Sequence, residues 1–389
     1  MTTSKCVEGV FVIVLCVTLA VVYYGPRLNA WRLSRLNDHN IQLLKSTPST
    51  PPQLFSKSSG VTRTTRGDYL TILIPNEDPG NLKLLRDHTF RTNPAFRTST
   101  CPLSLQLKMK DADWTLAGKY HPEIQMLMSE ELVDQSEYRR LQRFSIPYGL
   151  KMRPSLSYDD LARILSLFPA PESIFEFPDG EFRPSCIRCA VVGNGGILNG
   201  SARGREIDDH HMVFRLNNAI RRGHEVDVGN RTTHYFFYDR SLQNMDKRDV
   251  PTDKGIKYVF IPCRHNDYVY IKRVVNGWEP KIHASATDVR ILHPDFIRYV
   301  QRIWMGNSEL SSFYRPSTGA LMLFTALHAG CDRVQVFGMG YQLMYSVYYY
   351  DADYQRPHVA TSVHDLAKEI ELMDALNDAG IIDWYQRRT

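Results

Sequence analysis

Short apolar runs alternate with helical patterns over most of this chain. The clearest strand-like runs are Ala190–Val192, Met212–Leu216, Tyr258–Pro262 and Arg333–Phe337. Helical spacing of apolar positions predicts helices at Tyr158–Leu167, Pro294–Trp304, Gly319–Ala329 and Ser362–Ala379, the last followed by Gly380 as a C-cap. Strands that alternate with helices predict an α/β fold, in which helices flank a single sheet. The mostly helical pattern from Cys101 to about Arg183 is expected to pack against that sheet within the same domain.

The residues before Cys101 have a different pattern. Val10–Tyr24 contains no charged residue and is long enough for one helix across a thin bilayer. We therefore predict a tail over residues 1–9 and a transmembrane signal anchor over residues 10–25. A cleaved signal peptide is the alternative, but Leu28–Ala30 is a poor small-residue cleavage site.

After the anchor the chain is polar and irregular, most plainly at Ser46–Pro52 and Lys57–Thr65. Such a composition buries too little apolar surface to offset the entropy of the chain. Residues 26–100 are therefore predicted to form an extended stem, and residues 101–389 the main domain.

The charge pattern excludes one class of function. The 389 residues carry a formal net charge of +5, and the basic residues are scattered or lie beside a glycine turn. Proteins that bind nucleic acid concentrate basic residues in runs or stripes, so no nucleic-acid partner is expected. A small acidic substrate fits this mild positive charge better.

The most informative segment is Cys186–Asn218, which opens CIRCAVVGNGGILNGS. Its apolar strand leads into Gly193, Asn194, Gly195 and Gly196, and such a turn lets backbone amides approach an anionic ligand at a helix start. This pattern predicts a nucleotide site. A nicotinamide dinucleotide is disfavoured, because its fingerprint requires a glycine where this chain has Leu198.

The same segment resembles sialyl motif L of the animal sialyltransferases, and its wording looks closest to the alpha-N-acetylgalactosaminide alpha-2,6-sialyltransferases. Further segments follow in the order of that family. LHPDF at 292–296 and YRPSTGAL at 314–321 resemble motif S, Tyr348–Asp351 resembles motif III, and His364–Glu369 resembles the very short motif.

The resemblance implies a fold, a location and a reaction. The fold is a Rossmann-like, modified GT-A sheet, and the protein is a single-pass type II protein of the Golgi membrane with a lumenal catalytic domain. It transfers sialic acid from CMP-sialic acid, with inversion and without a metal cofactor, to O6 of a GalNAc that is O-linked to Ser or Thr of an acceptor protein. Three alternatives stay open: a related enzyme that uses a sialylated O-glycan or a glycolipid, a metal-dependent UDP-sugar transferase, and a catalytically silent Golgi nucleotide-binding protein.

The resemblance also implies roles for individual residues. Asn194 and Asn217 are expected to hydrogen-bond the cytidine monophosphate, since an amide both donates and accepts. His364 is the expected general base. The remaining donor-binding residues are Ser317, Thr318 and Gly319 at a predicted helix N-terminus, together with Tyr348.

Each of these residues also has an ordinary structural interpretation as a turn, a helix cap or a packed side chain. Two positions depart from the family pattern. His211 stands where the family commonly has Asp. Tyr348 stands where the family has His, and because a phenol is uncharged at neutral pH, Tyr348 can assist the leaving group only with a hydrogen bond. Glu369 is expected to be structural, reaching back to the start of its own helix.

Five of the seven cysteines lie beyond the anchor. The spacing of Cys186 and Cys189 would suit zinc, but no second pair completes a four-ligand site. The resemblance implies a disulfide between Cys189 and Cys331. Cys101 with Cys186 is a second expected pair, which leaves Cys263 as an odd thiol.

Two D-x-D strings, Asp111–Asp113 and Asp351–Asp353, raise the question of a divalent cation. Such strings are common by chance and nothing nearby completes a coordination shell, so no metal site is expected.

The charges that flank the anchor and the glycosylation sequons predict opposite sides of the membrane for the main domain. Only Lys5 precedes the anchor while Arg27, Arg32 and Arg35 follow it, which indicates a cytosolic C-terminus. Two glycosylation sequons, at Asn199 and Asn230, indicate a lumenal body instead. The family resemblance decides for the lumen.

Overall fold

The computed structural model describes part of the chain. The described residues are 62–66, 68–74, 80–151, 156–171, 173–175, 184–264, 266–306, 315–340, 342–357 and 363–387. The predicted tail and anchor, and the stem up to residue 61, lie outside the described residues. Within the described ranges, no helix has the length and apolarity that crossing a bilayer requires.

The centre of the fold is a sheet of eight strands in the order β11-β10-β5-β6-β7-β8-β9-β4. Seven strands are parallel, and β4 joins β9 in the antiparallel sense. The bounds are β4 Leu127–Met128, β5 Arg188–Val192, β6 Met212–Leu216, β7 His234–Phe237, β8 Lys257–Phe260, β9 Val289–Leu292, β10 Arg333–Phe337 and β11 Ile382–Trp384. The four predicted strands are therefore confirmed, and β4, β7, β9 and β11 are additional.

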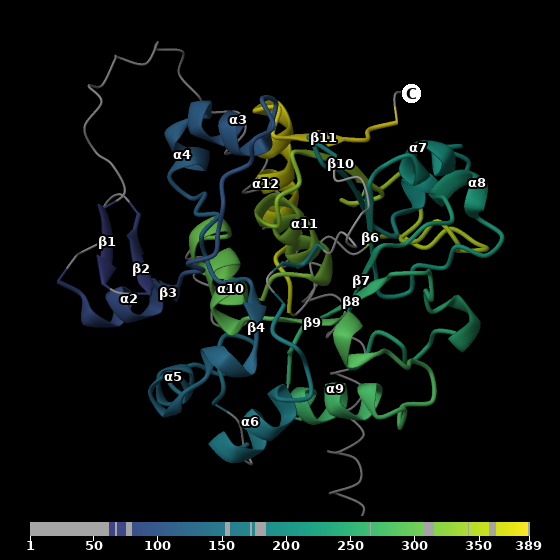
Figure 1. The fold of residues 1–389 in the computed structure, drawn as a ribbon. Coiled ribbons are helices and arrows are strands. Elements are labelled where there is room, and N and C mark those ends of the chain that lie inside the picture. The colour runs from purple at the N-terminus through teal and green to yellow at the C-terminus, as the bar shows by residue number, and fades with distance from the viewer. Residues whose placement is uncertain are drawn as a thin grey trace, which may run out of the picture. The chain divides into compact units, whose positions relative to one another are not determined.

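Helices cover both faces of this sheet (Figure 1). One face packs against α10 Pro294–Tyr299, α11 Thr318–His328 and α12 Leu366–Asp378, and a π-helical turn, Val300–Trp304, continues α10. The other face carries α6 Tyr158–Leu165, α7 Gly204–Asp208, α8 Glu225–Val228 and α9 Asp267–Val275. The four predicted helices correspond to α6, α10 with its π turn, α11 and α12. The last begins at Leu366 instead of Ser362, because Asp365 caps it by accepting from the Lys368 amide.

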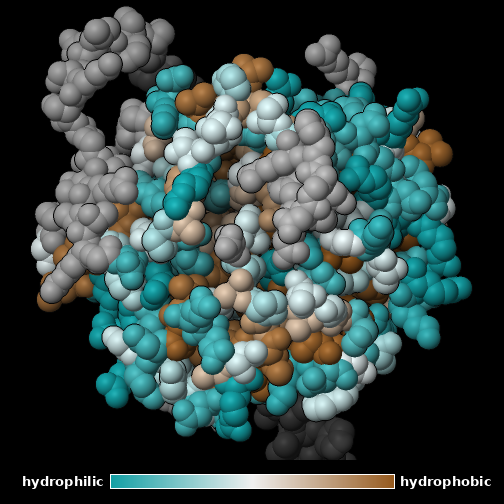
Figure 2. All heavy atoms as spheres, viewed as in Figure 1, coloured by the Kyte–Doolittle hydropathy of each residue, from teal (hydrophilic) through white to brown (hydrophobic). Residues whose placement is uncertain are grey.

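The alternation of side chains along β5 explains this three-layer arrangement. Cys189 and Val191 point into the cluster formed with α10, α11 and α12, whereas Ala190 and Val192 point into the cluster beneath α7 and α8. All four are buried, as expected of a central parallel strand that is covered on both faces. Outside this core, hydrophilic side chains cover most of the face in Figure 2, with smaller hydrophobic patches between them.

Residues 69–100 correct the predicted stem boundary. The strands β1 Thr62–Arg66, β2 Tyr69–Leu73 and β3 Thr89–Arg91 form a second, antiparallel sheet, with α2 Leu82–Asp87 between β2 and β3. Leu70, Ile72 and Phe90 are fully buried in the same core cluster as α10. An extended stem up to residue 100 is therefore wrong for this part, because a few alternating apolar residues suffice to dock a short strand.

A buried ionic network attaches this small sheet to the domain. Asp295, at the start of α10, is fully buried and accepts from the Arg91 backbone amide and from the Arg140 guanidinium, each at 2.7 Å. The same carboxylate lies 2.8 Å from the Arg298 guanidinium. Burial opposes ionisation of Asp295, but the two guanidinium groups prevail and hold its pKa below the usual value.

The region from Cys101 to about Arg183 was predicted to be mostly helical, but more than half of its described residues lie in turns and irregular segments. It contains α3 Leu105–Asp111, α4 Trp114–Ala117 and α5 Gln135–Leu141 besides α6. Short 3₁₀ turns occur at Glu130–Leu132, Gly196–Leu198, Lys247–Asp249 and Ala286–Asp288.

Both expected disulfides are present. Cys189–Cys331 joins the amino ends of the neighbouring strands β5 and β10, and Cys101–Cys186 ties the helical region to the residues just before β5. Cys263 is a free thiol.

Candidate active site

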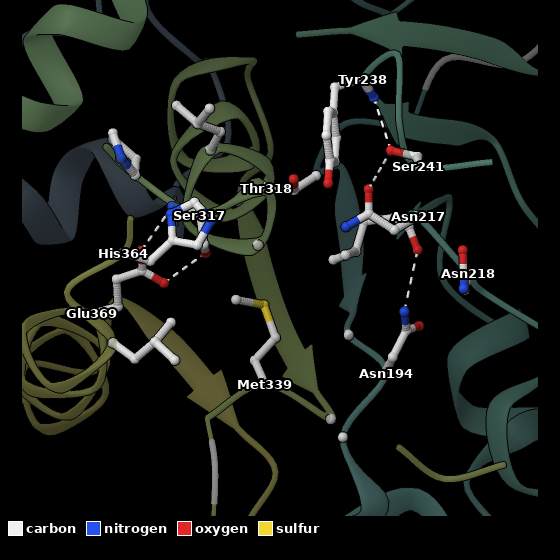
Figure 3. Close-up of a pocket in the computed structure, with 18 of the residues that line it drawn as sticks. Asn194, Asn217, Asn218, Tyr238, Ser241, Ser317, Thr318, Met339, His364 and Glu369 are labelled. Atoms are coloured by element: carbon white, nitrogen blue, oxygen red, sulfur yellow. Dashed lines mark hydrogen bonds between the residues drawn. The ribbon is translucent and has the colours of Figure 1, made fainter. Parts of the chain in front are cut away.

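A cavity lies where the strand order of the large sheet reverses. Chain connections leave β5 toward β6 on one side and β10 toward β11 on the other, so the carboxyl ends of β5 and β10 flank a topological switch point. A cavity of about 450 Å³ opens there, lined by the segments that follow β5, β6, β7, β8 and β10 and by the first turns of α11 and α12 (Figure 3). Ligands of open α/β sheets bind in such crevices.

The glycine turn after β5 was predicted to direct backbone amides at an anionic ligand, but its glycine amides bond to neighbouring backbone turns instead. The amides of Gly193 and Gly195 donate to the carbonyls of Phe337 and Gly338, each at 2.8 Å, and the Gly196 amide donates to the Ser346 carbonyl. These three amides therefore do not face an anion. A Cβ on Gly193 would lie 2.4 Å from the Gly338 oxygen, so the glycines permit two backbone turns to touch. The turn continues into a 3₁₀ turn and not into the predicted helix.

Asn194 and Asn217 both line the cavity, from the ends of the neighbouring strands β5 and β6. Asn217 adopts a φ of +45° and accepts from the Ser241 hydroxyl through Oδ1 at 2.7 Å, and its side-chain nitrogen points into the cavity (Figure 3). Asn194 donates weakly to the Leu216 carbonyl at 3.4 Å. Its Oδ1 is buried and has no hydrogen-bond partner among the described residues, so it could accept a hydrogen bond from an N–H or O–H group of a ligand.

Ser317, Thr318 and Gly319 begin α11 at the cavity wall, as predicted. Ser317 is the N-cap and accepts from the Ala320 amide at 3.0 Å. Its own amide and hydroxyl donate to Glu369 at 2.8 and 2.6 Å. Ser317 is therefore a structural cap, and Thr318 and Gly319 are the other residues of this helix N-terminus that line the cavity.

His364 also lines the cavity, just before α12 (Figure 3). Its Nδ1 donates to the Arg315 carbonyl at 2.9 Å, because a carbonyl oxygen can only accept. In the neutral ring Nε2 is then the basic nitrogen. Burial lowers the pKa of His364 below its usual value, so the ring is neutral at pH 7.

Glu369 does not reach back to its own helix start, which corrects the prediction. It spans instead to the other helix and accepts both Ser317 donors. Together with the Arg315 amide, which donates to the Val363 carbonyl at 2.9 Å, these bonds hold residues 315–317 against residues 363–369. Burial raises the pKa of Glu369 to about 7, although the two bonds from Ser317 act in the opposite direction.

With this geometry in place, comparison with known proteins decides the family. A sequence model of glycosyltransferase family 29 (sialyltransferase) matches residues 127–381. The chain belongs to this sialyltransferase family.

Two relatives of this sialyltransferase are similar to it over more than three quarters of their own length. It is 36% identical over 320 residues to mouse alpha-N-acetylgalactosaminide alpha-2,6-sialyltransferase 2, which covers 75% of this chain and 84% of the relative. The human protein of that name is 37% identical over 298 residues, covering 69% and 78%. The crystal structure of a mammalian sialyltransferase superposes with a TM-score of 0.53 at 25% identity, over 75% of this chain and all of the other.

Tyr348 lies at the cavity of the sialyltransferase and is 41% exposed. Its ring stacks on Tyr350 at 5.1 Å between centroids, and its amide donates to Asp351 at 2.9 Å. Burial, followed by the charge of Asp351, raises its pKa, so it is a neutral phenol. It offers a ring face and a hydroxyl, and no cation.

One aspartate of each D-x-D string takes part in a turn of the sialyltransferase. Asp351 accepts from the Ser346 hydroxyl and the Tyr348 amide, and Asp113 accepts from the Thr115 amide, so both stabilise turns. The one grouping of three potential ligands in the described part of the chain is Cys101, Cys186 and Asp332, whose two sulfurs form a disulfide.

His211 and the two sequons lie away from the cavity. His211, at the amino end of β6, accepts from the Arg188 amide through Nδ1. Its departure from the family pattern is therefore met by local packing at the opposite end of the sheet. Asn199 and Asn230 are both exposed.

The sequence missed several residues that line the cavity. Asn218 follows Asn217, and Tyr238 and Ser241 follow β7. Ser241 orients Asn217 directly. The short apolar run HYFF could have predicted β7. The carboxyl end of that strand would then have placed Tyr238 and Ser241 at the same edge of the sheet as Asn194 and Asn217. Arg315 was also missed.

Proposed function

We propose that this sialyltransferase moves sialic acid from CMP-sialic acid to O6 of a GalNAc that is O-linked to Ser or Thr of a protein. Two observations support the acceptor. The similar curated relatives are named for GalNAc and an alpha-2,6 linkage. A similar mammalian sialyltransferase, with a TM-score of 0.51 at 25% identity, is described in complex with Gal-beta-1-3GalNAc-ortho-nitrophenol.

The observation that carries the mechanism is a basic imidazole nitrogen in the same cavity as two amide side chains. His364 Nε2 takes the proton of the acceptor hydroxyl while that oxygen forms a bond to the anomeric carbon of sialic acid. The bond from this carbon to the phosphate oxygen breaks, and its electron pair leaves with CMP. A single displacement inverts the anomeric configuration. The Arg315 carbonyl stabilises the imidazolium that forms, because it accepts the Nδ1 proton.

The other end of the cavity is assigned to the leaving group. Asn194 and Asn217 bind the cytidine monophosphate, and the amides of Thr318 and Gly319 face its phosphate at the positive end of α11. Tyr348 donates one hydrogen bond there. No step requires a metal ion, and the proposed cofactor requirement is none.

The proposed setting is the Golgi membrane. Residues 1–9, 10–25 and 26 to about 61 would be the cytoplasmic tail, the anchor and the stem of a type II protein, with a lumenal domain of the modified GT-A type. Exposed Asn199 and Asn230 fit glycosylation in that compartment.

The test is transfer from CMP-sialic acid to glycopeptides that carry GalNAc, Gal-GalNAc or sialylated Gal-GalNAc, and to a glycolipid, with and without EDTA. We expect an α2,6 linkage to GalNAc that persists in EDTA. His364→Gln should lower kcat by roughly 100-fold or more, the usual contribution of a general base, with little change in the donor KM. His283→Ala, at an exposed residue outside the cavity lining, is the control.

Each alternative has its own signature in this experiment. A product on another sugar would show a different acceptor, and loss of activity in EDTA would indicate a metal-dependent transferase. CMP binding without any transfer would favour a silent binding protein. Wild-type rates in His364→Gln would refute the mechanism.

A further inference from the structure

Arg315 is a cation beside the proposed base. Its side chain lines the cavity and donates one long hydrogen bond, of 3.3 Å, to the Cys263 carbonyl. No carboxylate lies within 4.0 Å of its guanidinium among the residues that the structure describes. Two other arginines of the domain differ, since Arg264 pairs with Asp239 at 3.1 Å and Arg298 pairs with Asp295.

The neighbours of this guanidinium place it at the reacting end of the cavity. Arg315 lines the same cavity as His364, Tyr238 and Cys263. The backbone carbonyl of Arg315 accepts from the His364 ring, so the guanidinium and the base belong to two segments that are held together. A partly buried guanidinium with a single weak acceptor retains most of its five donors for a ligand.

The substrate carries a matching group. The anomeric carbon of sialic acid bears a carboxylate, and the oxygen that attacks this carbon must be within hydrogen-bond reach of the base. A carboxylate on the reacting carbon is therefore close to any cation next to His364. Guanidinium groups bind carboxylates through two parallel hydrogen bonds, which fix orientation as well as charge.

We propose that the Arg315 guanidinium binds the carboxylate of a sialic acid next to His364. This inference rests on the proposed function. Ser317, the other expected anion ligand on this segment, is excluded because Glu369 accepts both of its donors. The carboxylate belongs either to the donor sugar or to a sialic acid already present on the acceptor, and the two sources give different kinetics.

The experiment compares wild type with Arg315→Gln and Arg315→Lys in four measurements: the Kd of CMP, the Kd of CMP-sialic acid, and the KM of a neutral and of a sialylated GalNAc glycopeptide. CMP lacks the carboxylate, so its unchanged Kd shows that the variants fold and keep the nucleotide site. Arg273→Gln, at an exposed arginine of α9 that pairs with Glu279, is the matched control for charge.

If the carboxylate belongs to the donor, Arg315→Gln raises the Kd of CMP-sialic acid on the order of tenfold, equivalent to about 1.4 kcal/mol, and changes the Kd of CMP by less than twofold. For a carboxylate of the acceptor, only the KM of the sialylated glycopeptide rises by that factor. Lysine restores part of the loss, since it keeps the charge but not the fork.

The inference is overturned if neither CMP-sialic acid nor the sialylated acceptor changes by more than twofold, or if CMP weakens as much as CMP-sialic acid. Failure of the proposed function is distinct from both. It would appear as absent transfer to GalNAc by the wild type, while the comparison of CMP with CMP-sialic acid needs no acceptor.

Discussion

Replacing Glu369 by Gln should change how the stability of the enzyme depends on pH. Glu369 is partly buried and its carboxylate accepts the Ser317 amide and hydroxyl. Burial raises its pKa from the usual 4.5 to about 7. Gln has the same shape and keeps one acceptor for the Ser317 amide, but it does not titrate.

The sign follows from which state holds the proton. Between pH 4.5 and about 7, Glu369 is protonated in the folded protein and ionised in the unfolded chain. The folded state therefore binds more protons, and its free energy of unfolding falls as the pH rises through this interval. At about 1.36 kcal/mol per pH unit, the wild type should lose up to about 3 kcal/mol relative to the variant, with solvent screening reducing this value.

The measurement is urea-induced unfolding of both proteins, with disulfides intact, at pH 5 and pH 8. The quantity compared is the free energy of unfolding of the wild type minus that of the variant, in which the contributions of other titrating groups cancel. This difference should fall by at least 1 kcal/mol from pH 5 to pH 8. A difference that stays constant or rises would show that Glu369 ionises normally in the folded state, and that its two bonds to Ser317 outweigh its burial.

Three further changes test other parts of the structure. Gly193→Ala places a Cβ 2.4 Å from a backbone oxygen of the turn after β10, so this variant should have a lower melting temperature and weaker CMP binding. Gly319→Ala is the control, because its Cβ meets only the flexible tip of a side chain at 3.1 Å, and its melting temperature should equal that of the wild type. Replacing Cys189 and Cys331 together by Ser should cost about 2–5 kcal/mol in chemical unfolding, and an unchanged midpoint would contradict a stabilising role. Tyr348→His should raise kcat at pH 6 more than at pH 8, since only the protonated imidazole adds charge at the leaving group; a rate ratio equal to that of the wild type would place this residue away from the phosphate.

Local patterns were sufficient for the strands with long apolar runs. The bounds of β6 and β10 agree with the prediction, because Met212–Leu216 and Arg333–Phe337 are each bounded by polar residues or glycine. Strand β7 was missed because its four residues begin with a histidine. His234 is buried there and its pKa is lowered to about 4, so a residue that looks polar in sequence is neutral in the core.

The site was located by motif, but its internal bonds could not be read from the sequence. The motifs correctly brought His364, Asn194 and Asn217 to one cavity. The engagement of Ser317 by Glu369 joins residues 52 positions apart and depends on how α11 and α12 pack. The same packing places Arg315 beside the base, which no local pattern encodes.

The docking of the small N-terminal sheet sets a limit on how the enzyme can be shortened for secretion. A chain that begins at residue 101 would lack three core side chains, Leu70, Ile72 and Phe90, and the Arg91 amide that solvates Asp295. Production of a soluble form should therefore start ahead of Tyr69, and shorter versions are expected to be retained by the quality-control machinery of the secretory pathway instead of reaching the medium.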